Sequence, residues 1–287
     1  MNFFQSGVDV EDVYAALRDR EDLRAEREYI ERLWGWYDPL ADSHFTSDAR
    51  KHFYERFWEM YCAKGFSNAS LQLRAINGKG PDFCAELSGL RICVEANVPG
   101  PGAGAEGVPN ITPGVAQESP EKEIILRLRN GLEEKLKQWK KWKESGTVSK
   151  DDAYIVAFNS RRMHIAAPNW AMPYIVKTVF PLGGLTTAWG TNETEGATFY
   201  AKRSSLKKAS GNEVGTDVFL NEEYAEISAV LYSRVDCFNR PEIEGQDFTV
   251  VHNPLAAVKL PKGFLGFGKE YWVSDEGELC DRGWNNG

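Results

Sequence analysis

Two acidic residues on either side of a short turn carry the clearest chemical signal in this sequence. Asp82 precedes the apolar run 83–87, Glu95 lies in the run 90–96, and Ser88-Gly89 separates the two runs. A two-residue turn with Gly in second place is typical of a β-hairpin. In that hairpin Asp82 faces Glu95, and opposed like charges repel. Because carboxylate oxygens are the ligands that Mg²⁺ and Mn²⁺ prefer, the pair predicts a divalent-cation site.

The same register sorts the other side chains of the hairpin by face, because side chains alternate along a strand. One face receives only apolar pairs: Leu87/Leu90, Ala85/Ile92 and Phe83/Val94. The other face receives the polar pairs: Glu86/Arg91, Cys84/Cys93 and Asp82/Glu95. The simpler alternative is that Asp82 only begins a strand and that Glu95 is a surface acid, with an ion pair from Lys79 or Arg91.

The spacing of these acids resembles the core of the PD-(D/E)XK nuclease superfamily. Twelve residues separate Pro81-Asp82 from Glu95-x-Asn97. In that family the aspartate and glutamate lie on adjacent strands and hold catalytic magnesium, so the resemblance implies Asp82 and Glu95 as metal ligands. Asn97 stands where the family has its motif lysine. The resemblance covers roughly residues 49–159.

Two helices supply the remaining residues that the resemblance implies. Some family members provide the lysine from the following helix, and Lys135, Gln138 and Trp142 are similar to the glutamine-and-aromatic helix motif of the RecB-like branch. Their i, i+3 and i+7 spacing places them on one helix face. Family members also add a glutamate from the preceding helix, which makes Glu59 a third metal ligand, the alternative being an exposed helix glutamate. The implied catalytic residues are Asp82, Glu95, Lys135, Glu59 and Gln138.

The elements that must position these residues can be read from periodicity and turn signals. Helices are expected over 9–33 and Ala49–Lys64, and an antiparallel meander over Leu71–Ile76, Phe83–Leu87 and Leu90–Ala96. Residues 99–120 are rich in Gly and Pro and predict a loop.

A crossover unit is expected after that loop. Ser119-Pro120-Glu121 is a good helix start, and this helix is expected to end at Glu144, before Ser145-Gly146. The apolar run Tyr154–Phe158 then predicts a strand buried on both faces. Later strands are expected at Ala225–Ser233 and Phe248–His252, while Ala166–Ala201 is ambiguous.

The resulting fold class is α/β. The expectation is a restriction-endonuclease-like central mixed sheet flanked by helices, with an N-terminal helical segment over residues 1–48. The PD-(D/E)XK-like domain would then span 49–287 and include a C-terminal extension of strands.

The net charge and the distribution of basic residues give opposite indications about a nucleic-acid partner. The net charge of −8 argues against a polyanionic partner, but basic residues concentrate in 121–143 and 202–208. The alternative is a solvated helix face and a charged loop. The basic residues expected to contact nucleic acid are Lys122, Arg127, Arg129, Lys137, Lys140, Lys141, Lys202 and Arg203.

Composition points to a cytoplasmic protein. No basic segment followed by a long apolar run opens the sequence, and the five cysteines form no C-x-x-C pair. The family resemblance, in turn, implies a Mg²⁺- or Mn²⁺-dependent nuclease that acts on DNA rather than RNA, in restriction or phage defence, as a possible homodimer without a membrane partner. The alternative is a catalytically silent nuclease-like scaffold that binds nucleic acid or a protein.

Overall fold

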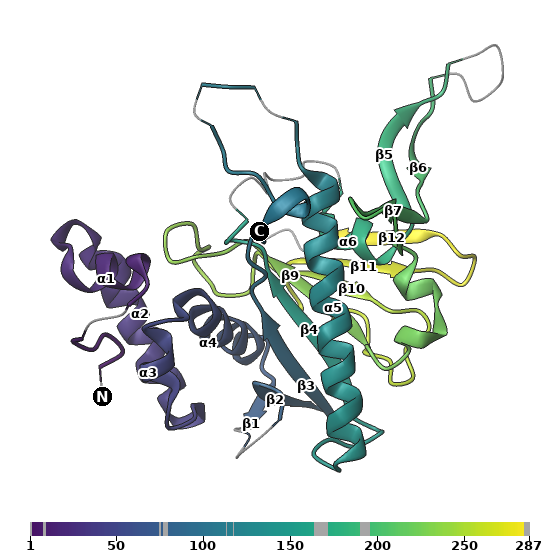
Figure 1. Cartoon of the computed structure of the whole chain (residues 1–287). Coiled ribbons are helices and arrows are strands. Elements are labelled where there is room, and N and C mark those ends of the chain that lie inside the picture. The colour runs from purple at the N-terminus through teal and green to yellow at the C-terminus, as the bar shows by residue number, and fades with distance from the viewer. Residues whose placement is uncertain are drawn as a thin grey trace.

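The structure, a computed structural model, describes residues 2–7, 10–74, 76, 80–112, 114–116, 118–163, 172–189 and 196–283. Its largest element is a mixed eight-stranded sheet with the order β1-β2-β3-β4-β9-β10-β11-β12 (Figure 1). Its strands are β1 (Gln72–Arg74), β2 (Phe83–Leu87), β3 (Leu90–Asn97), β4 (Ala153–Asn159), β9 (Ala229–Ser233), β10 (Thr249–His252), β11 (Lys269–Val273) and β12 (Leu279–Gly283).

Helices cover both faces of this sheet. Four N-terminal helices, α1 (Asp12–Asp19), α2 (Arg24–Tyr37), α3 (Phe45–Ala49) and α4 (Phe53–Asn68), share one buried cluster with Ile155 and Ala157 of β4. On the other face α5 (Glu121–Glu144) and α6 (Tyr174–Val179) pack against Tyr154, Val156 and Phe158. Because β4 is buried along its whole length, an unbroken apolar run suits it. The α/β class with a large mixed sheet flanked by helices is therefore confirmed.

The hairpin of β2 and β3 has the predicted register. Phe83 pairs with Val94 and Leu87 with Leu90, and the three pairs between them match as well. Ser88 and Gly89 both adopt positive φ, 50° and 87°. A type I′ turn requires this conformation at both central residues, and its twist matches that of the flanking strands. Asp82 and Glu95 lie one pair beyond the end of this ladder.

The crossover unit is also confirmed. The chain leaves β3, forms the loop and α5, and returns in β4, which is parallel to β3 (Figure 1). Helix α5 follows Pro120, has acids in its first turn and lysines in its last, and these charges complement the helix dipole. It ends at Glu144, and Ser145 and Gly146 follow, the glycine with a φ of 73°. As a result α5 lies lengthwise over β3 and β4.

Several boundaries differ from the expectations. The first helices extend to Tyr37, the next helix covers 53–68 rather than 49–64, and β1 ends at Arg74. The strand expected from Ala225 begins at Ala229, because a 3-10 turn precedes it. The 3-10 turns are Glu21–Leu23, Asp38–Leu40, Gly104–Glu106, Val218–Leu220 and Glu222–Tyr224.

Strands that the sequence pattern did not predict complete the structure. They are β11 and β12 of the main sheet and two small hairpins, β5 (Leu182–Thr187) with β6 (Thr198–Lys202) and β7 (Ser205–Lys207) with β8 (Glu213–Gly215). The ambiguous segment 166–201 contains α6, β5 and part of β6, and its residues 166–171 and 190–195 lie outside the described residues. None of the described helices is long and apolar enough to cross a membrane.

Candidate functional site

Asp82 and Glu95 lie at the same end of the β2–β3 hairpin. The carboxylate of Asp82 accepts a hydrogen bond from the backbone N–H of Ala96 at 2.6 Å, which holds it against β3. Glu95 is only 4% exposed, so it is not the surface acid of the simpler alternative. Its Oε1 accepts a hydrogen bond from Lys135, while its Oε2 is buried without a hydrogen-bond partner. Glu95 therefore has one carboxylate oxygen still available to a ligand.

Lys135 reaches the site from the middle of α5. Its Nζ lies 2.6 Å from Glu95 Oε1, and its side chain is 20% exposed, so the ammonium does not point into solvent. Gly131, one turn earlier, allows the helix to come this close. A Cβ at Gly131 would lie 2.9 Å from the Phe158 ring and 3.2 Å from Asn97 Nδ2. Lys135 of α5 thus lies against Glu95, two positions before Asn97.

Glu59 approaches the same acids from α4. It is 6% exposed, which contradicts the alternative of an exposed helix glutamate. Tyr37 donates its hydroxyl to Glu59 Oε1 at 2.6 Å, and Arg56 donates to Oε2 at 2.8 Å. Both oxygens are therefore already hydrogen-bonded, and Glu59 could bind a metal only by releasing one of these donors.

Burial makes the charges of these three carboxyl groups costly. It raises the pKa of Glu95 to about 8, with the charge of Asp82 acting in the same direction and Lys135 opposing it. The same two causes, burial and then Asp82, raise the pKa of Glu59 to about 8. Burial also raises the pKa of Asp82, against the charge of Lys135 and the Ala96 hydrogen bond. One lysine and one arginine do not compensate for three acids, of which Glu59 and Glu95 are buried and Asp82 is half-buried, and a cation would be stabilised here.

The donor set fits a hard cation with a small number of protein ligands. Across the described residues, no group of three or more His, Cys, Asp or Glu side chains is arranged to hold a metal ion. Mg²⁺, however, usually keeps several waters and needs only one or two carboxylates. Asp82 and the unpartnered Oε2 of Glu95 could supply those two. The expectation of Glu59 as a third ligand does not follow from its present contacts.

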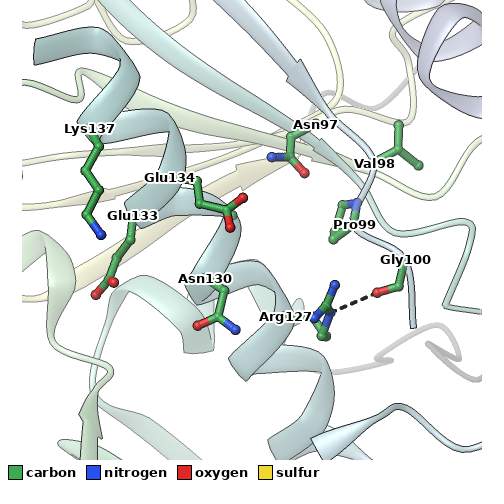
Figure 2. A pocket seen from close by; sticks show the side chains of 10 residues that line it. Asn97, Val98, Pro99, Gly100, Arg127, Asn130, Glu133, Glu134 and Lys137 are labelled. Carbon is green, nitrogen blue, oxygen red and sulfur yellow. Dashed lines mark hydrogen bonds between the residues drawn. The ribbon is translucent and has the colours of Figure 1, made fainter. Parts of the chain in front are cut away.

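A polar cavity of about 400 Å³ opens between the end of β3 and α5, and its lining includes Asn97 but not Asp82, Glu95 or Lys135 (Figure 2). Asn97 is two positions after Glu95, so the two side chains lie on the same face of β3. In Figure 2 the side chains of Asn97 and Glu134 approach one another from β3 and α5. Arg127 donates to the Gly100 carbonyl at 2.9 Å at the other end of the cavity. Asn97 is thus shared between this cavity and the face of β3 that carries Glu95.

Comparisons of the chain with protein-family models, curated proteins and solved structures found no match.

Gln138 and Trp142, the other two residues of the predicted motif on α5, differ in burial. Gln138 is half-buried, one turn beyond Lys135 on α5. Trp142 is buried in the cluster that joins α5 to the sheet, together with Leu136 and Trp139. Trp142 therefore stabilises the packing of α5 and is not open to a substrate.

The predicted nucleic-acid contacts divide by exposure. The prediction that Arg129 contacts phosphate is wrong. Arg129 is 6% exposed and donates to the Gly215 carbonyl and to the Tyr224 hydroxyl. Arg203 is half-buried and bonded to Glu121 and to the Leu182 carbonyl. Arg127 and Lys122 are half-buried, and Arg127 lines the cavity. The fully exposed members are Lys137, Lys140, Lys141 and Lys202.

Tyr37 and Arg56 belong to the site but were not predicted from the sequence. Arg56 could have been found, because it lies three residues before Glu59 on one helix, where side chains meet. Tyr37 is 22 positions away on another helix, and no local pattern indicates its contact.

The raised pKa values predict that the cation-free protein loses stability as pH rises. A carboxyl group with a pKa near 8 when folded and about 4.3 when unfolded binds more protons in the folded state between these values. The free energy of unfolding should therefore fall from pH 5 to pH 8. Glu95→Gln should reduce this fall by about 1–3 kcal/mol, measured by urea unfolding with EDTA present.

Glu86→Gln is the matched control, because Glu86 lies on the same hairpin but is partly exposed and paired with Arg74. It should leave the pH dependence nearly unchanged. If the free energy of unfolding depends on pH equally in wild type and Glu95→Gln, then ionising Glu95 in the folded protein costs no free energy and the predicted rise of its pKa is wrong.

Proposed function

We propose that this chain is a metal-dependent nuclease that hydrolyses phosphodiester bonds in DNA, with a PD-(D/E)XK-like site on a restriction-endonuclease-like sheet. The contact that carries the proposal is the 2.6 Å ion pair between Lys135 and Glu95. It joins a helix lysine to an opposed carboxylate pair on adjacent strands, as the resemblance requires when position 97 is not a lysine.

Each residue has a separate role in this proposal. Asp82 and Glu95 would hold Mg²⁺ or Mn²⁺, and the bound ion would supply positive charge at the phosphate and make a water more acidic. Lys135 would donate to the attacking water or to the negative charge that develops on the phosphoryl oxygens. Glu59, held by Tyr37 and Arg56, adds negative charge beside Asp82 and so favours cation binding. Gln138, one turn beyond Lys135, would position the substrate.

The exposed lysines of α5 would contact the DNA backbone. Lys137 lies beside the cavity, and Lys140 and Lys141 follow it on the same helix. Contacts of this kind make binding strongly salt-dependent, because counterions are released from the DNA. A stand-alone nuclease with this site would suit restriction or phage defence, an inference from the family resemblance alone.

Metal-dependent cleavage tests the proposal. Wild type should cut plasmid or single-stranded DNA in Mg²⁺ or Mn²⁺ and not in EDTA. Glu95→Gln should lose about 10²-fold or more of this activity, since it removes a metal ligand and the charge beside Lys135. Glu86→Gln should retain activity. Cleavage that persists in EDTA, or that is equal in wild type and Glu95→Gln, would contradict the assignment.

The silent scaffold is a second candidate, favoured by the fact that Lys135 already neutralises Glu95 without a cation and that Asn97 replaces the motif lysine. A scaffold would bind DNA with a salt-dependent affinity but would cleave neither duplex nor single strands in any divalent cation. Binding without cleavage in wild type would therefore select this candidate.

A further inference from the structure

Two cysteines face each other on the hairpin that carries the acidic pair. Cys84 of β2 and Cys93 of β3 are register partners, and their Sγ atoms lie 2.9 Å apart. Directly opposed residues in an antiparallel pair have Cα atoms about 4.5–5.5 Å apart. Disulfides join Cα atoms about 4.4–6.8 Å apart. The two thiols can therefore be joined without moving the strands.

A cavity of about 430 Å³ leads to this pair from the outer side of the hairpin. Cys84 lines it, although its exposure is only 1%. Arg74 and Arg91 also line it, and their side chains are 65% and 41% exposed, while Glu86 is the acid among the lining residues. Each arginine is paired with an acid, Arg74 with Glu86 and Arg91 with Asp152, so the charges at the entrance balance.

We propose that Cys84 and Cys93 are a redox-active dithiol that low-molecular-weight disulfides of the glutathione class oxidise reversibly. The Cys84 thiolate, which lines the cavity, attacks one sulfur of oxidised glutathione and forms a mixed disulfide, releasing the first glutathione thiolate. The Cys93 thiolate then attacks Cys84 Sγ, forms the Cys84–Cys93 bond and releases the second. Two thiols are oxidised, one disulfide is reduced, and the two protons end on the glutathione thiols or in solvent.

The position of the bond links it to the acids. Cys84 is two residues after Asp82, and Cys93 two residues before Glu95, so the two pairs are neighbours on one face of the hairpin. A disulfide draws the sulfurs to about 2.05 Å. The bond would link the two strands covalently next to Asp82 and Glu95, and this constraint should change cation binding there. Only this consequence rests on the proposed nuclease site; formation of the disulfide does not.

Mass spectrometry of the folded full-length protein tests the dithiol. After treatment with oxidised glutathione, wild type should lose two hydrogen atoms. Trypsin cleaves after Arg91, between the cysteines, so the bond would appear as two linked peptides that separate on reduction with dithiothreitol. Cys84→Ala and Cys93→Ala should each abolish the linked species. Cys280→Ala is the matched control and should retain it, because Cys280 lies on β12.

The outcomes separate the dithiol from the nuclease. A linked peptide in wild type, with unchanged circular dichroism, supports the dithiol whether or not the protein cleaves DNA. If the linked peptide is absent from folded wild type, or forms only after the protein unfolds, the proposal is wrong. This conclusion needs only the wild-type protein and does not depend on whether the variants fold. If the oxidised and reduced proteins show the same Mn²⁺-induced shift in Tm, the link to the acids is wrong although the dithiol remains.

Discussion

Lys135→Ala is expected to abolish metal-dependent DNA cleavage, with a loss of roughly 10²–10⁴-fold. Lys135 is the cation that α5 places against Glu95, at 2.6 Å, and position 97 supplies an amide instead. Without it, neither the attacking water nor the charge on the phosphoryl oxygens has a positioned donor. The measurement is the rate of plasmid and single-strand cleavage in Mg²⁺.

Lys135→Ala also affects the free energy of unfolding. Removing one partner of a buried ion pair can cost about 3–5 kcal/mol when the other charge stays buried. Glu95 can escape most of this cost by taking up a proton, since its pKa is already raised to about 8. Lys135→Gln keeps a hydrogen-bond donor for Glu95 while removing the charge. Both variants should therefore fold, as circular dichroism would show, and both should be inactive.

Lys140→Ala is the matched control on the same helix. Its side chain is exposed, and it should weaken DNA affinity modestly and equally for all sequences, with a smaller salt dependence. The two lysines should thus separate chemistry from binding. A folded Lys135→Ala protein that cleaves at the wild-type rate would overturn the role assigned to this lysine.

The hairpin and the crossover could be predicted because their signals are local. The register of β2 and β3 follows from the alternation of side chains and from Ser88-Gly89, since a shift by one residue would expose the apolar face. A long helix between two parallel strands must then pack on the sheet, which brings α5 over β3. Asp82, Glu95 and Lys135 meet for this reason.

The predictions from sequence that were wrong or missing concern contacts between distant parts of the chain. Arg129 seemed to be a phosphate contact, but β8 and the turn before β9 provide Gly215 and Tyr224 as its partners. The sequence pattern did not place strand β11, which contains the charged residue Glu270. Glu270 is 4% exposed, is hydrogen-bonded to His252 of β10 and forms an ion pair with Arg282 of β12. No pattern within a short window reveals such compensation.

Because the carboxylates of Asp82, Glu95 and Glu59 repel one another, a bound cation is expected to stabilise the folded protein even without catalysis. Mn²⁺ at about 100 times its Kd should stabilise wild type by about 2.7 kcal/mol, which raises the Tm by several degrees. Asp82→Asn should lose this shift, because one of the two ligands no longer carries a charge. Thermal unfolding at pH 8, with Mn²⁺ or EDTA, measures both values.

Asp82→Asn should also change the cation-free protein in the opposite direction. The asparagine oxygen can still accept the Ala96 N–H, so the local structure is kept. At the same time the charge that raises the pKa of both Glu95 and Glu59 disappears. In EDTA at pH 8 the variant should therefore melt at a higher temperature than wild type, while in Mn²⁺ the difference should shrink or reverse. A variant that melts lower than wild type in EDTA and shows an undiminished Mn²⁺ shift would mean that Asp82 is a structural residue and that the cation binds elsewhere.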